Sequence, residues 1–174
     1  MTLSEYKTLS MEGDTQFVNT TFKFWQFKTW VSNLIRMACK APNHSFMIFK
    51  EGDEWVAIGA RTPVVRKTTL EYELIGNRVT VKRKKVDDIE KKRAYMYSKL
   101  GTPYDYESLL IFQPIQLIFH IWLGPVGFKA RKADYCYELT AETNEYPNPS
   151  SLNPIEYFNW NGYETIIDNE LITE

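Results

Sequence analysis

The clearest hydrophobic pattern in the chain is a pair of adjacent apolar runs. These runs, 44–50 and 54–60, are rich in β-favouring residues and flank a short turn that contains glycine. The arrangement predicts a β-hairpin. A hairpin that turns at this glycine places His44 opposite Arg61 and on the same face as Gly59, because side chains alternate between the two faces of a strand.

Periodicity also predicts the other elements of the chain. Helical spacing or alternation indicates helices over residues 27–40, from 87 or 88 to about 100, from 105 through the apolar stretch 109–123, and from 136 onward, with short strands at 22–25, 63–68, 78–83 and 157–160. A helix followed by strands and then by further helices is typical of an α+β fold, with an antiparallel sheet packed against helices.

The domain organisation follows from the same reading. Weak periodicity predicts a loosely ordered arm over residues 1–21. One domain is expected over 22–146, and a tail rich in proline and aromatic residues over 147–174 is expected to pack on it. The length of 174 residues and the 44% hydrophobic content fit one packed core.

Two features of the chain bear on its location. The apolar stretch 109–124 contains Gln113, Pro114 and His120 and is shorter than the roughly twenty apolar residues that a membrane span needs. It therefore predicts a buried helix and no transmembrane segment. The first residues lack a basic region followed by an apolar run, so no signal peptide is expected. A cytoplasmic or virion-associated protein fits both observations.

The balance of charge argues against nucleic acid as a partner. The net charge is −1, with 21 basic and 22 acidic residues. The local basic run 82–85 is followed closely by Asp87 and Asp88, so a solvated face is the preferred interpretation. The alternative, nucleic-acid binding through this run, would give an affinity that falls steeply with salt.

Only two cysteines, Cys39 and Cys136, are present, and they form no Cys-x-x-Cys pair. This count excludes a disulfide scaffold and gives no reason to expect zinc, another metal or any other cofactor. Two thiols without an export signal fit a reducing compartment, or a particle assembled inside a cell.

One cysteine and one histidine are candidates for chemistry. Cys136 begins a predicted helix, whose N-terminal partial charge favours a thiolate, whereas Cys39 lies near the end of its own helix. His44 opens the first strand of the hairpin, and His120 is interpreted as structural. Taken alone, a cysteine is more often a small core residue than a nucleophile, so the interpretation depends on the ordered set.

That set consists of three segments. Residues 43–49 are similar to a strand with the pattern Ser-His-Val-Gly-Ile, residues 94–105 to a helix that ends in Leu-Gly-x-Pro-Tyr-Asp, and residues 135–139 to a Cys-Ser-Glu-Leu motif. Together they resemble the permuted NlpC-type papain-like cysteine hydrolases, the branch that includes lecithin:retinol acyltransferase-like and bacterial permuted amidase-like proteins. In that branch the histidine precedes the cysteine, as here. The resemblance covers roughly residues 22–143.

The resemblance implies a papain-like fold in circularly permuted order and a thiol hydrolase or acyltransferase. Cys136 would attack an amide or ester, a peptide or peptidoglycan-like amide being preferred, and His44 would be the base. The backbone N–H of Cys136 would contribute to an oxyanion hole, and Tyr104 and Tyr135 would line the site, together with Gly59 and Arg61. The expected partner is then a small peptide-like or acyl substrate.

The sequence also departs from the family pattern. Gly59 has no side chain to orient the imidazole, Arg61 would disfavour the imidazolium, and Tyr137 replaces a small serine. The alternative is therefore a weak or inactive pseudoenzyme with a binding or structural role, which could include a virion protein. The aromatic C-terminal tail could provide its protein interface. The side of the His44 ring away from Cys136 separates these hypotheses: a hydrogen-bond acceptor favours an enzyme, and Arg61 alone favours the alternative.

Overall fold

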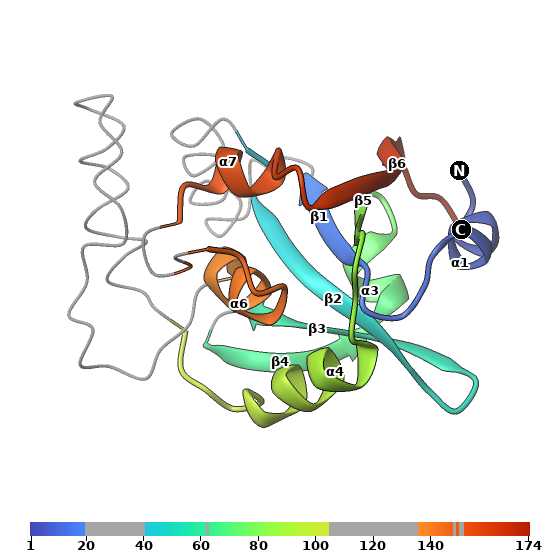
Figure 1. The fold of residues 1–174 in the computed structure, drawn as a ribbon. Helices are drawn as coiled ribbons and strands as arrows, with labels where there is room; N and C mark the ends of the chain where they lie inside the picture. The colour runs from blue at the N-terminus through green and yellow to red at the C-terminus, as the bar shows by residue number, and fades with distance from the viewer. Residues whose placement is uncertain (20–40, 62, 105–135, 148, 150–151) are drawn as a thin grey trace.

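The described part of the chain is organised around one antiparallel sheet in the strand order β4-β3-β2-β1-β5-β6 (Figure 1). This computed structural model describes residues 1–19, 41–61, 63–104, 136–147, 149 and 152–174. The strands are β1 (Thr15–Asn19), β2 (His44–Glu51), β3 (Glu54–Arg61), β4 (Val64–Thr69), β5 (Arg78–Lys84) and β6 (Tyr163–Leu171). The α+β class with an antiparallel sheet is thus as predicted.

Helices cover both faces of this sheet. Residues of α4, α6 and α7 pack on one face, and residues of α1 and α3 pack on the other. The bounds are α1 (Leu3–Leu9), α3 (Leu70–Leu74), α4 (Ile89–Ser98), α6 (Cys136–Thr143) and α7 (Pro154–Phe158). We call the two sides the α6 face and the α3 face.

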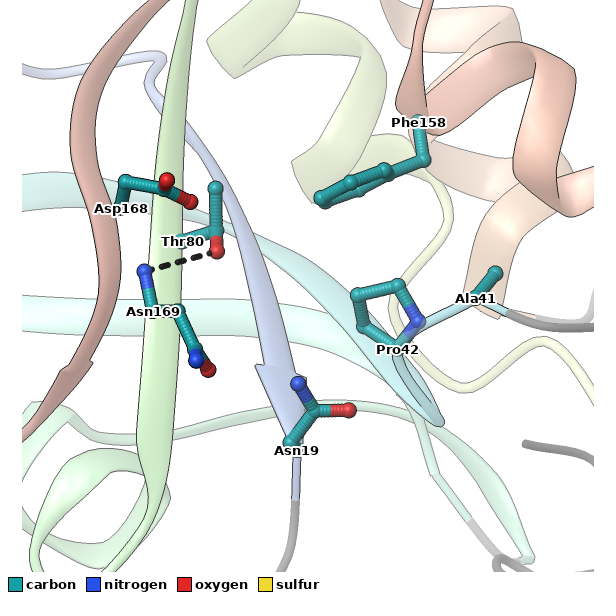
Figure 2. Close-up of a pocket in the computed structure, with 7 residues that line it drawn as sticks. All are labelled: Asn19, Ala41, Pro42, Thr80, Phe158, Asp168 and Asn169. Atoms are coloured by element: carbon teal, nitrogen blue, oxygen red, sulfur yellow. Dashed lines mark hydrogen bonds between the residues drawn. The ribbon is translucent and has the colours of Figure 1, made fainter. Parts of the chain in front are cut away.

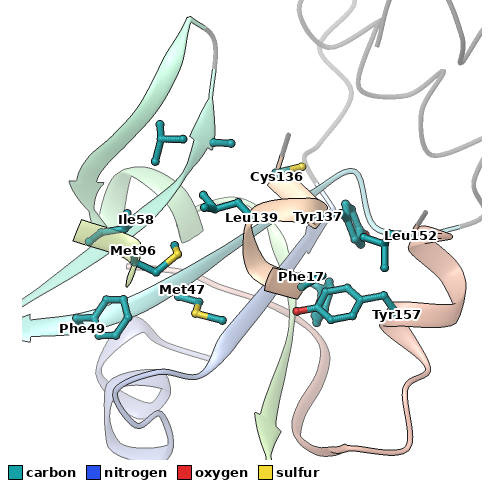
Figure 3. Close-up of a cluster of buried hydrophobic side chains, with 14 of the residues drawn as sticks. Phe17, Met47, Phe49, Ile58, Met96, Cys136, Tyr137, Leu139, Leu152 and Tyr157 are labelled. Carbon is teal, nitrogen blue, oxygen red and sulfur yellow. The ribbon is translucent and has the colours of Figure 1, made fainter. Parts of the chain in front are cut away.

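Strand β2 contributes to the core on both faces. Met47 and Phe49 belong to the cluster on the α6 face (Figure 3), and Phe46 and Ile48 belong to the cluster on the α3 face. All four side chains are fully buried. The alternation of a strand therefore places successive residues of β2 in two different environments.

The predicted hairpin is confirmed in position and register. β2 and β3 pair with Met47 opposite Ile58, which is the register that places His44 across from Arg61. The strands predicted at 63–68 and 78–83 correspond to β4 and β5.

Two predicted helices are also present. The Asp88 side chain accepts a hydrogen bond from the N–H of Lys91 and so caps α4. Gly101, with a φ of 83°, follows the helix in the left-handed region that favours glycine. Helix α6 covers Cys136–Thr143 of the described residues, where a helix is predicted.

The N-terminal residues differ from the expected loose arm. They form α1, which has a complete capping box at Thr2 and Glu5, and β1, which pairs with both β2 and β5. Phe17 and Val18 explain the strand, because they are fully buried on opposite faces of the sheet. Five residues are too short a run for periodicity to reveal.

The C-terminal tail also differs from its prediction. The strand expected at 157–160 is wrong, since α7 occupies residues up to Phe158. Asn153 caps this helix and Pro154 is its first residue, a combination that favours a helix start. The tail then adds β6 to the edge of the sheet beside β5.

Several predicted features lie outside the described residues. These are the strand at 22–25, the helices over 27–40 and from 105, and the side chains of Cys39, His120 and Tyr135. Within the described ranges, every helix is too short or too polar to cross a bilayer.

Candidate functional site

Cys136 is the first described residue of α6. The residue is 6% exposed and belongs to the cluster on the α6 face. One turn further on, the Thr140 hydroxyl lies 3.1 Å from the Ser45 hydroxyl of β2. Thr140 also donates to the carbonyl groups of Cys136 and Tyr137. Ser45 therefore connects the start of β2 to the start of α6.

Burial raises the pKa of the Cys136 thiol, because the thiolate would lose its hydration. Smaller effects oppose this rise: the backbone N–H groups of Ser45 and Tyr137, the Ser45 hydroxyl, and the positive charge of Arg61. Cys136 is therefore a neutral thiol at neutral pH, although hydrogen-bond donors surround its sulfur.

His44 lies on the opposite face of the sheet. In the sheet, His44 pairs with Val18 of β1, which belongs to the cluster on the α3 face. Its ring centre is 5.5 Å from the ring centre of Phe46, two residues along the same face. The ring nitrogen Nε2 accepts a hydrogen bond from Arg61. No hydrogen bond among the described residues joins His44 to Cys136.

Arg61 and Glu73 hold the His44 ring in place. Arg61 Nε donates to His44 Nε2 at 3.3 Å, and Arg61 Nη2 donates to the Glu73 carboxylate. The carboxylate oxygen Oε2 is 3.9 Å from His44 Nε2, and the Thr68 hydroxyl donates to Oε1 at 2.8 Å. The Glu73 side chain is only 3% exposed, so this carboxylate is a fixed part of the α3 face.

These contacts keep His44 neutral. Burial, followed by the positive charges of Arg61 and Arg66, lowers the pKa of His44 well below its usual value of 6.5. Because Nε2 accepts a hydrogen bond from Arg61, the geometry assigns the remaining ring proton to Nδ1. Nε2 is then already engaged and does not accept a proton from a thiol in this arrangement.

Gly59 has no room for the polar orienting side chain of the family pattern. A Cβ atom built at Gly59 would lie 2.7 Å from the Cβ of Phe46 and 3.4 Å from the carbonyl oxygen of Ser45. Contacts this short would require the paired strands to separate. The polar group nearest to the His44 ring after Arg61 instead comes from α3, through Glu73.

Tyr104 of the expected site lining, and Tyr137 next to the candidate nucleophile, both have structural contacts. Tyr137 is 2% exposed and its hydroxyl donates to the carbonyl of Pro42, so it anchors the approach to β2. Tyr104 is partly buried against the cluster on the α6 face, and its N–H donates to the carbonyl of Pro63. Tyr137 therefore points into the core and does not narrow a cleft.

The sequence did not predict the roles of Glu73, Arg66 and Thr140. Glu73 belongs to a five-residue helix, which is too short to show helical periodicity. A local signal was available in Thr69, whose side chain caps this helix. That signal predicts a helix start, but it does not indicate that Glu73 reaches a strand residue far away in sequence.

The basic segment of β5 and α4 has carboxylate or core partners. Lys82 is 8% exposed, and its Nζ lies 4.3 Å from the Phe158 ring centre. Five of the cations that follow it are matched by acidic groups, in the pairs Arg83–Asp14, Lys84–Glu145, Lys91–Glu145, Lys92–Asp87 and Arg93–Glu12, and Lys85 is not among them. These pairs leave little unbalanced charge for a phosphate backbone.

The aromatic residues of the tail are largely core residues. Tyr157 and Tyr163 are 0% and 7% exposed, and the Asn144 amide donates to both hydroxyls. This hydrogen bonding allows two tyrosines to be buried at low cost. They therefore do not form the exposed interface expected from the sequence.

A pocket of about 330 Å³ lies between β1, β5, β6 and α7 (Figure 2). It is lined by Asn19, Ala41, Pro42, Thr80, Phe158, Asp168 and Asn169. Asn169 has a positive φ of 52°, and its N–H donates to the Thr80 hydroxyl. None of the site residues expected from the sequence lines this pocket.

Metal binding and known relatives add no further assignment. In the part of the chain that the structure describes, no group of three His, Cys, Asp or Glu residues converges as metal ligands would. No family model matches the sequence, and no curated protein matches it.

Proposed function

We propose that this chain has a permuted papain-like arrangement and acts by binding, without a working catalytic cysteine–histidine pair. The observation that carries the proposal is the placement of the two candidate side chains. Cys136 packs on the α6 face, His44 lies on the α3 face, and Arg61 occupies His44 Nε2. A thiol hydrolase needs its base within hydrogen-bond reach of the nucleophile.

The electrostatics support the same proposal. An ordinary cysteine is only a few per cent thiolate at pH 7, and burial raises the pKa of Cys136 further. The imidazole that would compensate is held neutral beside Arg61 and Arg66. The thiol is thus protonated, and the imidazole nitrogen Nε2 already accepts a hydrogen bond from Arg61.

A second candidate function is a thiol hydrolase or acyltransferase that cleaves an amide or ester, with a peptide-like amide as the preferred substrate. The donors around the sulfur favour it, because the N–H groups of Ser45 and Tyr137 point toward Cys136 at the start of a helix. Such groups stabilise a thiolate or an oxyanion. This function requires the His44 ring to leave Arg61 and reach the α6 face.

The two functions are separated by the pH dependence of iodoacetamide labelling at Cys136. Labelling is followed by peptide mass spectrometry in wild type, His44→Ala and His44→Gln, with the Cys39 peptide as an internal reference. The midpoint of the pH profile is compared, because a buried thiol labels slowly whatever its pKa. A binding protein gives a Cys136 midpoint at or above about 8.5 that neither variant changes.

A hydrolase gives the opposite result. Cys136 would then label with a midpoint well below that of the reference thiol, and both His44 variants would remove the difference. That outcome would overturn the proposed binding function and justify a search for amide and ester substrates.

A further inference from the structure

Two arginines converge on one aromatic ring of the α3 face. The guanidinium carbon of Arg61 lies 5.7 Å from the ring centre of Tyr72, and that of Arg66 lies 5.9 Å from it. Both distances fall within the range of cation–π contacts. Arg66 is on this face because it pairs with Gly59 across β3 and β4. Tyr72 is 61% exposed, so solvent reaches this cluster.

The charges in this cluster do not balance. Glu73 is bonded to Arg61 and Thr68, and the nearby Glu71 is paired with Lys7. No hydrogen bond or ion pair in the described structure involves the Arg66 guanidinium, and its Nε is buried without any partner. Of the two guanidinium groups beside Tyr72, only that of Arg61 therefore has a carboxylate partner.

An unpaired, buried N–H of a charged group is costly and calls for an explanation such as a bound ion. The guanidinium fork matches the two oxygens of a carboxylate or phosphate better than it matches any neutral acceptor. The Tyr72 ring centre lies 5.9 Å from the guanidinium carbon of Arg66 and the residue is 61% exposed, so a ligand that carries an anionic group can reach the cluster from the side of Tyr72.

We propose that Arg66, with Arg61 and Tyr72 beside it, forms a binding site for an oxyanion group, a carboxylate or phosphate carried by a small ligand. The proposal extends the binding function by naming the chemistry of the ligand. Its test does not use the reactivity of Cys136, so either proposal can fail without the other.

The test is a titration of the isotopically labelled wild-type protein, followed by NMR. Inorganic phosphate and acetate are added separately, with sodium chloride at matched ionic strength as the control. We expect saturable shifts of the Arg66 Nε–H signal and of the Tyr72 ring signals with at least one anion, and none with chloride. The more effective anion identifies which oxyanion the site prefers. Absence of a saturable shift with both anions would overturn the proposal.

Variants assign the binding to Arg66. Arg66→Gln removes the guanidinium and is expected to weaken binding about tenfold, the loss of one charge-assisted hydrogen-bond pair, with the Tyr72 ring signals as the readout. Arg66→Lys keeps the charge without the fork and should lie in between. Lys67→Gln is the matched control, since it removes a cation from the next position of β4, on the α6 face opposite Ile58.

The variants are also informative if binding persists. An Arg66→Gln protein that binds the anion as tightly as wild type would contradict the proposed site. So would a Lys67→Gln protein whose affinity falls as much as that of Arg66→Gln. A bound anion should also raise the pKa of His44, because it neutralises a charge that now lowers that pKa. A His44 pKa that is unchanged at saturating anion would place the anion elsewhere.

Discussion

The two faces of the sheet at the start of β2 hold different kinds of polar group. On the α6 face, Ser45 and Thr140 join two hydroxyl groups beside a buried thiol. On the α3 face, His44 meets a guanidinium and a buried carboxylate. His44 and Ser45 each find a hydrogen-bond partner on their own face, so neither needs a partner from the other face.

This difference shows how one position along a strand decides chemistry. His44 and Ser45 are adjacent in sequence, yet the alternation of the strand directs them to opposite sides. A shift of β2 by one residue that moved His44 into the position of Ser45 would place an imidazole beside Cys136 and the side chain of Asn43 beside Glu73. The catalytic interpretation and the binding interpretation thus differ by the facing of a single residue.

The largest expected effect concerns the buried carboxylate of the α3 face. Glu73→Gln leaves Arg61 without its ion pair, and because Arg61 is partly exposed we expect a loss of about 2–3 kcal/mol in the free energy of unfolding. Urea denaturation measures this loss. The control is Glu71→Gln, whose exposed pair with Lys7 should contribute less than about 0.5 kcal/mol. Equal effects of the two variants would contradict the role of Glu73 in the α3 face.

A smaller effect is expected on the α6 face. Thr140→Val removes the hydroxyl that lies 3.1 Å from the buried Ser45 hydroxyl and should reduce the free energy of unfolding by about 1–2 kcal/mol. Thr8→Val is a matched control, because Thr8 is also a helix residue whose hydroxyl donates to the carbonyl four residues earlier, but it is exposed. We expect little change there. A neutral Thr140→Val would show that the Ser45–Thr140 contact does not connect β2 to α6.

The smallest expected effect is on the pH dependence of folding stability, which differs between the two faces. His44 has a lowered pKa in the fold, so its stabilising contribution is present above the unfolded value near 6.5 and decreases as pH falls below it. Between pH 6.5 and 5.5 the wild type should lose about 1 kcal/mol more than His44→Gln. An identical acid dependence of the two proteins would contradict a buried, neutral His44.

The contribution of Cys136 to stability depends on pH in the opposite direction, and the change occurs at alkaline pH. Its pKa is raised in the fold, so its contribution is complete below the unfolded value and is lost as pH rises through the folded value. Relative to Cys136→Ala, wild type should therefore become less stable as pH rises above about 8.5. A wild type that gains stability in this range would indicate a stabilised thiolate, and hence a working site.

Much of the fold followed from the sequence. The hairpin, β4, β5, α4 and the start of α6 were visible because each has an apolar run, a cap or a glycine of its own. α1, β1, α3 and α7 were missed because each has too few residues for periodicity to appear, and their stability comes from packing and capping.

The candidate site was predictable only in part. The facing of His44 and Arg61 followed from the turn, and the structure confirms it. The face that α6 covers did not follow, because β2 is apolar on both sides and its pattern contains no polar face to orient it. The partners Glu73 and Arg66 come from tertiary packing, which no local pattern encodes.

The facing of β2 can be tested directly by disulfide formation with Cys136. Ser45→Cys and His44→Cys are each made in a Cys39→Ser background, oxidised mildly and analysed as unreduced peptides. The Ser45 hydroxyl lies 3.1 Å from the Thr140 hydroxyl, one turn along α6 from Cys136, and disulfides require closely spaced Cβ atoms. The account predicts that Ser45→Cys crosslinks to Cys136 and that His44→Cys keeps two free thiols. A crosslink from His44→Cys, with none from Ser45→Cys, would place His44 beside Cys136 and contradict the separation of the two faces.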